Sequence, residues 1–322
     1  MSKKKNLFGS ISLITLIFFL PLGVGASEEL PEPVLILNSK DRAHLPKNFR
    51  TSKDPFRERS LYTPSREGLS GLNISGSAQF SESGFGEMLK VLPAHFVVVD
   101  LREESHGFLN GDAVSWFAAN NWANRGKNLE EIESDEKARL WQAFQAGRVM
   151  VNQVTRKKSD GGIAETVSLP VEVKNALTEA QMVFSQHLDY FRLSVTDHLR
   201  PTDDAVDRFL AFYKELPKNT WLHFHCRAGA GRTTTFMLMT DILRNARRVE
   251  LKDLARRQAL IGGVDLLSTP PVDELERRWY DERADFLKAF YRYAKQYRRS
   301  QPVTWSEWVN ADRISPVLTE NN

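Results

Sequence analysis

The feature that most constrains this 322-residue chain is a glycine-rich turn between a strand-like and a helix-like segment. Residues 221–225 favour a buried strand, and residues 233–245 favour a strongly apolar helix. The small residues of the turn let its backbone approach a ligand with the N–H groups pointing inward, and the helix adds its positive N-terminal end. We therefore expect an anion cradle of phosphate size. Its backbone comes from five residues: Arg227, Ala228, Gly229, Ala230 and Gly231.

Two side chains at the ends of this turn carry the chemistry. Arg232 can donate two parallel hydrogen bonds to phosphate oxygens, which a lysine could not reproduce. Cys226 is the one cysteine of the chain, and a helix N-terminus beside an arginine favours its thiolate form, which is the nucleophile. The alternative is an inert cysteine buried at a strand end. It would require the arginine, the glycines and the flanking polar residues to coincide, so we disfavour it.

The residues that flank the nucleophile have supporting roles in this interpretation. Thr233 can donate a hydrogen bond to the sulfur and help it leave at the end of a reaction. His225 can orient the turn through hydrogen bonds to its backbone. Further upstream, Asp100 and Arg102 follow a buried strand, and we expect them to organise loops rather than to react.

A proton donor is expected at Asp197, 29 residues before Cys226. It follows a short strand at 190–195 and precedes His198 and Pro201, so it lies in a loop ahead of a helix. An aspartate there can protonate a leaving oxygen and then act as base on water. By itself Asp197 would more often be a helix-capping residue. The presence of Cys226 and its arginine makes the catalytic role the better interpretation.

Strands that alternate with helices predict an α/β sandwich with a mainly parallel sheet. We expect the core at about 90–147 and 174–300, preceded by an extended arm at about 27–70. Two strand-like runs with no helix between them predict a small β insertion at about 148–173. Together these parts would form one domain spanning 27–322.

The N-terminus has the pattern of a secretory signal peptide, residues 1–26. Three lysines precede a short apolar run, and small residues end at Ala26, where we expect cleavage; an uncleaved anchor is the alternative. Export to the periplasm or the medium would follow, and no later stretch reaches the roughly 20 apolar residues of a membrane span. The full chain has a net charge of +3, and without 1–26 it has 41 basic and 41 acidic residues. A nucleic-acid partner is therefore not expected, and an anion must be held by a local site.

With these residues identified, the sequence resembles the Cys-x5-Arg phosphatases and, more closely, the protein-tyrosine-phosphatase-like (PTP-like) inositol polyphosphatases, the cysteine phytases of bacteria. The strings that carry the resemblance span nearly the whole chain. They are Asn48-Phe49-Arg50-Thr51-Ser52, Asp100-Leu101-Arg102-Glu103-Glu104-Ser105-His106-Gly107, Val114-Ser115-Trp116, Thr196-Asp197-His198, Asp207-Arg208-Phe209-Leu210-Ala211-Phe212-Tyr213, Leu222-His223-Phe224-His225-Cys226 with its loop and Arg232-Thr233-Thr234, Ile261-Gly262-Gly263 and Phe290-Tyr291-Arg292-Tyr293. The resemblance implies a PTP-like three-layer sandwich with a partial β-barrel insertion. It also implies hydrolysis of myo-inositol hexakisphosphate (phytate) through a phosphocysteine, with no metal and no other cofactor.

Further substrate-binding candidates follow from the resemblance and from charge. They are His198, Lys157, Arg277, Arg278, Asn121 and the loop residue Arg227. Arg227 stands where family members often have Glu, and Asn121 where they can have Asp. Ile36 and Glu276 replace a family arginine and a family lysine. For Lys157 the alternative is a solvated surface charge. For Arg277, Arg278 and Arg283 the alternative is surface ion pairing, which we favour for Arg283.

Other functions remain open from the sequence. A secreted tyrosine or dual-specificity phosphatase could use the same loop, because only pocket depth and surrounding charge separate the two substrate classes. A catalytically inactive module that binds inositol phosphates is a third possibility. Arsenate reductase or rhodanese activity is disfavoured, since a second cysteine is lacking. The sequence does not indicate an oligomeric state or the inositol position attacked first.

Overall fold

Two sheets and eight α-helices organise the part of the chain that this computed structural model describes, residues 32–57, 62–158, 162–296 and 303–314. Everything below refers to the unit Pro33–Asn322. The expected signal peptide, 1–26, lies outside the described residues. Among those residues no helix combines the length and the apolar character needed to cross a membrane.

The central sheet has five strands in the order β10-β4-β11-β3-β2. The strands are β2 (Arg50–Thr51), β3 (Ile74–Ala78), β4 (Phe96–Arg102), β10 (Asp189–Val195) and β11 (Trp221–Cys226). β10, β4, β11 and β3 run parallel, while β2 pairs antiparallel with β3. Every residue of β4 and β11 is buried, which explains their nearly continuous apolar sequences. The predicted, mainly parallel sheet is confirmed.

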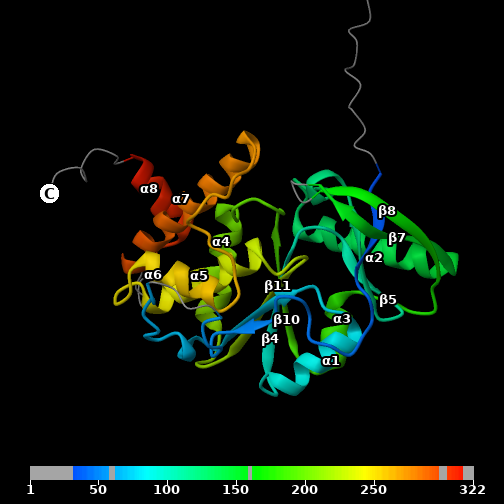
Figure 1. The fold of residues 1–322 in the computed structure, drawn as a ribbon, viewed down its shortest axis with the longest axis horizontal. Helices are drawn as coiled ribbons and strands as arrows, with labels where there is room; N and C mark the ends of the chain where they lie inside the picture. The colour runs from blue at the N-terminus through cyan, green and yellow to red at the C-terminus, as the bar shows by residue number, and fades with distance from the viewer. Residues whose placement is uncertain (1–31, 58–61, 159–161, 297–302, 315–322) are drawn as a thin grey trace, which may run out of the picture. The chain divides into compact units, whose positions relative to one another are not determined.

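Helices cover both faces of this sheet (Figure 1). On one face lie α4 (Asp203–Glu215), α5 (Gly231–Asn245), α6 (Leu251–Leu260), α7 (Glu274–Gln296) and α8 (Trp305–Ile314), and on the other α1 (Glu82–Val91) and α3 (Glu179–Ser185). The larger cluster buries Phe209, Phe224 and Phe236 between α4, β11 and α5. The smaller one packs Phe85 and Met182 against the opposite face. This is the three-layer α/β sandwich that the sequence predicted.

A second sheet has six strands in the order β8-β7-β1-β6-β5-β9. They are β1 (Val34–Ser39), β5 (His106–Leu109), β6 (Asp112–Phe117), β7 (Arg148–Lys157), β8 (Ile163–Glu172) and β9 (Ala176–Leu177). The hairpin β7–β8 corresponds to the β insertion expected at 148–173. The sheet, however, also takes β1 from the N-terminal arm and β5–β6 from the segment expected to be core. Its strand order runs from one edge to the other, so the described pairings form an open sheet rather than a closed barrel.

Local sequence explains how this second sheet is held. Asn110 and Gly111, both at positive φ, form the two-residue turn between β5 and β6, as an Asn-Gly pair favours. Helix α2 (Leu129–Ala146) packs on the sheet through Leu140 and Ala143. It begins at a capping box between Asn128 and Glu131 and ends at Gly147 in the left-handed conformation. The short helices η1 (Ser70–Leu72) and η2 (Ala119–Asn121) complete the described elements.

Candidate active site

The loop that connects β11 to α5 is held tightly against the end of β3. Cys226 is the last residue of β11 and Gly231 the first of α5, so residues 227–230 form the turn between them. Gly229 has φ +69°, and a Cβ there would lie 2.3 Å from the backbone nitrogen of Ala78. Both the left-handed conformation and this close approach require glycine. The loop therefore has the compact form that an inward-facing ring of amides needs.

The arm that precedes β3 fixes the outer side of this loop. Arg50 is fully buried and donates from Nη1 to the carbonyl of Gly229 at 2.8 Å and from Nη2 to Oγ1 of Thr234 at 3.0 Å. Asn48 donates from Nδ2 to the carbonyl of Ala228 at 2.9 Å. Two loop carbonyls are thus held on the side of the arm. The sequence had placed Arg50 only within a string of family resemblance, because nothing local indicates that it reaches the loop.

Cys226 is 3% exposed as a residue, and its sulfur lies at the N-terminal end of α5. Thr233 donates from Oγ1 to Sγ at 3.2 Å, the contact that the sequence predicted. A hydroxyl in this position stabilises a thiolate and would do so again when the sulfur leaves a phosphorylated intermediate.

Arg232 is held by a carboxylate that sequence reasoning missed. Its Nη1 and Nη2 atoms donate to the two oxygens of Glu104 at 2.8 and 3.0 Å, a bidentate pair in which both side chains are buried. Burial opposes the charge of Arg232, but Asp197 and Glu104 outweigh it and hold the pKa of Arg232 well above its usual value. Burial likewise opposes ionisation of Glu104, yet Arg232 and Arg102 lower its pKa. The guanidinium is therefore permanently charged and rigidly oriented.

Asp197 lies beside that guanidinium, although 35 residues separate the two in sequence. Its Oδ2 atom is 3.1 Å from Nη2 of Arg232 and accepts a hydrogen bond from Nδ2 of Asn121 at 3.0 Å. The indole of Trp122 donates to its backbone carbonyl at 3.0 Å. The side chain keeps 22% of its exposure, so a ligand can reach it. The structure thus brings together the predicted acid and the predicted phosphate-binding arginine.

His225 has a different environment from the one expected. It was predicted to hydrogen-bond to the loop backbone, but its Nε2 atom lies 2.6 Å from Oε1 of Glu179 on α3. It is fully buried and packs on Phe80 at 5.0 Å between ring centroids. Burial raises the pKa of Glu179, and His225 reverses this effect and lowers it to about 2. His225 therefore supports the loop through its close contact with Glu179 and through ring packing.

Asp100, Glu179 and His225 place one ligand atom each within 4.8 Å of one another, a spacing that could hold a metal ion. The chemistry of the neighbours does not fit a divalent cation. Nε of Arg192 lies 3.2 Å from Oδ2 of Asp100, and Nε2 of His106 lies 3.3 Å from the same oxygen. The carboxylates already have cationic partners, so this cluster is a buried ion-pair network.

Several cations surround the mouth of the site. Arg227 is half-buried, with its guanidinium 5.0 Å from the ring centroid of Phe117. Lys157, exposed on β7, has its pKa lowered by partial desolvation and then by Arg227 and Lys47. Arg283 of α7 is 6% exposed, and its Nη1 lies 3.0 Å from where a Cβ on Gly231 would be. The expectation that Arg283 forms surface ion pairs is therefore wrong, because it is buried against the loop.

Comparison with known proteins places this geometry in a family. The sequence model of a family described as PTP-like phytase, inositol hexakisphosphate, matches residues 99–244. The solved structure of a PTP-like phytase from Bdellovibrio bacteriovorus is 33% identical with a TM-score of 0.68, covering 87% of this chain and 97% of that one. The chain belongs to the PTP-like phytase family.

Two further relatives are longer than the chain described here. The PTP-like myo-inositol phosphatase from Mitsuokella multacida, solved in complex with myo-inositol-(1,3,4,5)-tetrakisphosphate, is 38% identical with a TM-score of 0.82, covering 91% of this chain and 50% of that one. Effector protein HopD2 from Pseudomonas syringae pv. tomato is 30% identical over 251 residues, 75% of this chain and 52% of that protein. The chain spans about half the length of each.

The remaining substrate-binding candidates from the sequence differ in how close they lie to the loop. His198 follows Asp197 at positive φ and packs 5.6 Å from the ring of Trp279, at the start of α7. Arg278 is exposed and pairs with Glu274 one helical turn away, which agrees with the alternative of surface ion pairing. Arg277, next to it, is also exposed. The α7 cation that lies against the loop is therefore Arg283.

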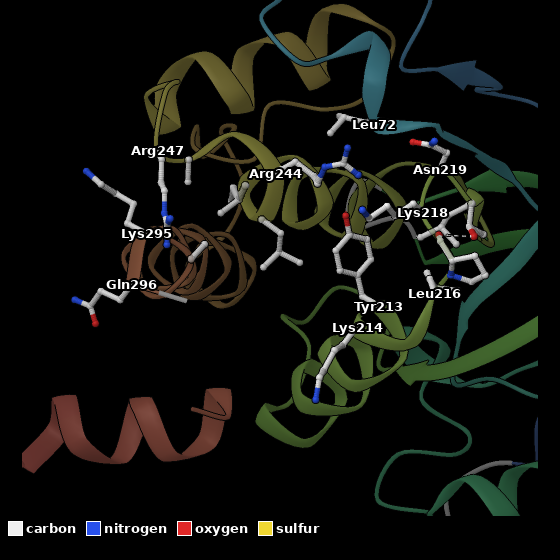
Figure 2. A pocket seen from close by; sticks show the side chains of 17 residues that line it. Leu72, Tyr213, Lys214, Leu216, Lys218, Asn219, Arg244, Arg247, Lys295 and Gln296 are labelled. Atoms are coloured by element: carbon white, nitrogen blue, oxygen red, sulfur yellow. Dashed lines mark hydrogen bonds between the residues drawn. The ribbon is translucent and has the colours of Figure 1, made fainter. Parts of the chain in front are cut away.

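A cavity of about 1260 Å³ lies elsewhere in the described residues. Figure 2 shows it at the C-terminal ends of α4, α5 and α7, with the side chains of Tyr213, Lys218 and Arg244 directed toward it. None of the predicted site residues lines it. Three of its five cations, Lys214, Arg244 and Lys295, stand in the last turns of those helices, where basic residues offset the helix dipole. Their position at helix C-termini therefore explains these three cations without a ligand.

Proposed function

We propose that this chain is a phosphomonoester hydrolase that removes phosphate from myo-inositol hexakisphosphate through a phosphocysteine intermediate. The observation that carries the proposal is the convergence of three groups: Arg232 lies 3.1 Å from Asp197, and Thr233, next to Arg232, donates to the sulfur of Cys226. A nucleophile, an oxyanion-binding cation and a proton donor around one amide-lined loop are what phosphoryl transfer requires.

The first step transfers the phosphoryl group to sulfur. The Cys226 thiolate attacks phosphorus, while the guanidinium of Arg232 and the loop amides bind the equatorial oxygens. The bond from phosphorus to the inositol oxygen breaks, and its electron pair stays on that oxygen. Asp197 delivers its proton there, so the leaving group departs as a neutral alcohol.

The second step regenerates the enzyme. Water attacks the phosphorus of phosphocysteine and gives its proton to the Asp197 carboxylate. The sulfur–phosphorus bond breaks with its electron pair on sulfur, and the hydrogen bond from Thr233 stabilises the thiolate as it leaves. Inorganic phosphate is released, and Asp197 is again protonated for the next cycle.

The cations around the mouth support a substrate with several phosphates. Arg227, Lys157 and Arg283 come from the loop, β7 and α7, and each interacts electrostatically with Asp197. One phosphate on the loop cannot contact all of them, whereas an inositol ring carries neighbouring phosphates in several directions. The tetrakisphosphate bound by the Mitsuokella relative is a ligand of this class.

Two further points belong to the proposal. We expect residues 27–322 to act as one phosphatase domain, and we expect export after cleavage at Ala26 to the periplasm or the medium. N-terminal sequencing of the protein recovered from each fraction of an expressing bacterium checks the cleavage site. An intact N-terminus in the membrane fraction would favour the uncleaved anchor instead.

The central experiment compares kcat/KM for phytate and for a phosphotyrosine peptide, with Cys226→Ser as the control. We expect phytate to be preferred and the variant to lose turnover by more than about 10⁴-fold while it still binds the substrate. Chromatography that separates inositol phosphate isomers over time identifies the position attacked first. A preference for the peptide would assign a tyrosine phosphatase, and binding of phytate without turnover by the unaltered chain would assign an inactive binding module.

A further inference from the structure

The turn formed by η2 is built to aim one amide at the acid loop. Asn120 and Asn121 have φ values of 53° and 65°, a left-handed conformation that asparagine tolerates better than most residues. Asn121 is 1% exposed, so its position is set by packing rather than by solvent. Its neighbour Trp122 donates from the indole to the carbonyl of Asp197, which ties the same turn to the acid loop a second time.

The Asn121 contact helps to fix the orientation of the Asp197 carboxyl group. Nδ2 donates to Oδ2 at 3.0 Å, and Nη2 of Arg232 lies 3.1 Å from the same oxygen. The backbone N–H of His198 donates to Oδ1 at 3.1 Å. Every one of these contacts places a donor against a carboxyl oxygen, so together they hold the group in one orientation.

The two side-chain donors do not persist equally through a reaction. In the proposed mechanism the guanidinium of Arg232, still held by Glu104, also binds the phosphate oxygens, so the N–H groups that face Asp197 are shared with the substrate when Asp197 must give up a proton. Asn121 makes no such contact with the loop, and its amide can stay on Oδ2. It is then the side chain that orients the acid during the transfer.

We propose that Asn121 is a positioning residue for Asp197: its amide fixes the carboxyl group of the acid against the leaving oxygen. This inference rests on the proposed phosphoryl transfer, but not on inositol as the leaving group. It assigns Asn121 a role toward the acid instead of the contact with substrate that the sequence suggested.

Other titratable and charged groups also face Asp197. They are Arg232 from α5, Arg227 from the loop, Lys157 from β7, Arg283 from α7 and the adjacent His198. The amide of Asn121 is uncharged and donates to the same carboxyl group. A carboxyl group in its place keeps the shape of the side chain, but when ionised it repels the Asp197 carboxylate.

The first test is the pH dependence of kcat/KM in Asn121→Asp. Two carboxyl groups at about 3 Å share one proton, so the pair remains protonated to higher pH than a single carboxyl group does. We expect the basic limb of the profile to move up by about one pH unit or more relative to the unaltered protein. Asn120→Asp is the matched control, because it adds the same charge one residue away, and we expect less than half of that shift.

The second test uses Asn121→Leu, which keeps the branched outline of the side chain and removes the donor. Aryl phosphates whose leaving groups differ in basicity report on proton donation, since an enzyme with a well-placed acid is insensitive to that basicity. We expect the leucine variant to lose at least about tenfold more rate on phenyl phosphate than on nitrophenyl phosphate. KM should change less than kcat, as fits a residue that acts through the acid.

These outcomes separate the inference from its alternatives. The inference would be overturned if the basic limb of the kcat/KM profile moved equally in Asn121→Asp and Asn120→Asp. It would also be overturned if activity fell by the same factor at every pH and on every leaving group. Either result would assign Asn121 a structural role only. If phytate is not hydrolysed but aryl phosphates are, the proposed substrate fails, yet both tests of Asn121 can still be read. If Asn121→Asp does not fold, the leaving-group series with Asn121→Leu decides.

Discussion

Strand β11 and helix α5 have a cluster of cations at each end, and the two clusters differ in every property that matters for binding an anion. At the Cys226 end, Arg50 and Arg232 are 0% and 3% exposed, and the helix presents its N-terminus. At the opposite end, Lys218 and Arg244 are exposed around the large cavity, where helices present their C-termini (Figure 2). Only the first end combines positive side chains with backbone N–H groups.

The difference teaches that the number of cations does not define an anion site. Each helix terminus carries the equivalent of about half an elementary charge, positive at the N-terminus and negative at the C-terminus. The end with three converging C-termini therefore offsets part of the charge of its own cations. Burial adds to the contrast, because a charge pair near the surface is weakened by solvent and salt far more than a buried one.

The largest effect that tests this contrast is expected from Arg50→Met. Arg50 is buried without a carboxylate partner among its described contacts, and burial lowers its pKa to about 10, with Cys226 opposing and Arg57 adding to the effect. Its removal lets the Gly229 carbonyl turn inward and takes a positive charge from beside the sulfur. We expect kcat/KM to fall by about 10²-fold.

Stability should respond differently from activity in this variant. Met removes a buried charge but leaves the carbonyls of Gly229 and Asn48 without their donor, so the two effects oppose each other and we expect the urea midpoint of Arg50→Met to fall only modestly. The rate of Cys226 alkylation by iodoacetate at neutral pH should fall in parallel with kcat/KM, since both depend on the thiolate. A variant that loses stability but alkylates normally would assign Arg50 to folding alone.

A smaller effect is expected on stability at high pH, through the ion pairs beneath the loop. Burial and Arg102 oppose the charge on His106, but Asp100 and Glu136 outweigh them and raise its pKa to about 9. Protonated His106 therefore stabilises the fold fully below about pH 6.5, and this contribution is lost as the pH rises through about 9. The loss amounts to at most about 3 kcal/mol of the free energy of unfolding.

Urea unfolding at several pH values between 6 and 9.5 measures this loss. The unaltered protein should become less stable over that range, whereas His106→Gln should start lower and show a flatter profile. Parallel profiles for the two proteins would contradict a charged His106.

Sequence reasoning succeeded where the determinants are local. The strand, the glycine-rich turn and the apolar helix around Cys226 lie within 25 residues, and each has its own pattern of side chains. The contact from Thr233 to the sulfur follows from their adjacency on the first turn of α5. The mainly parallel sheet was equally accessible, because fully buried strands such as β4 have continuous apolar sequences.

It failed where a contact joins distant segments. Glu104 orients Arg232 across 128 positions and Arg50 reaches Gly229 across 179, and neither pair has a spacing that a pattern could reveal. Arg283 was assigned to the surface because acidic residues surround it in sequence, although the helix turns its side chain to the loop. One sequence signal could have indicated the Glu104 contact. The string Asp-Leu-Arg-Glu-Glu before His106 places many charges next to a buried strand, and buried charges require partners.

The smallest effect is expected at the cavity end, from the double variant Lys218→Glu with Arg244→Glu. Helix α5 has 15 residues, so its two ends lie roughly 20 Å apart, more than twice the Debye length of about 8 Å at physiological salt. Reversing two exposed charges there should change KM for phytate by less than about twofold at 0.15 M salt. At 10 mM salt screening weakens, and association should slow measurably. A tenfold rise in KM at physiological salt would mean that the cavity binds substrate, and the contrast between the two ends would no longer hold.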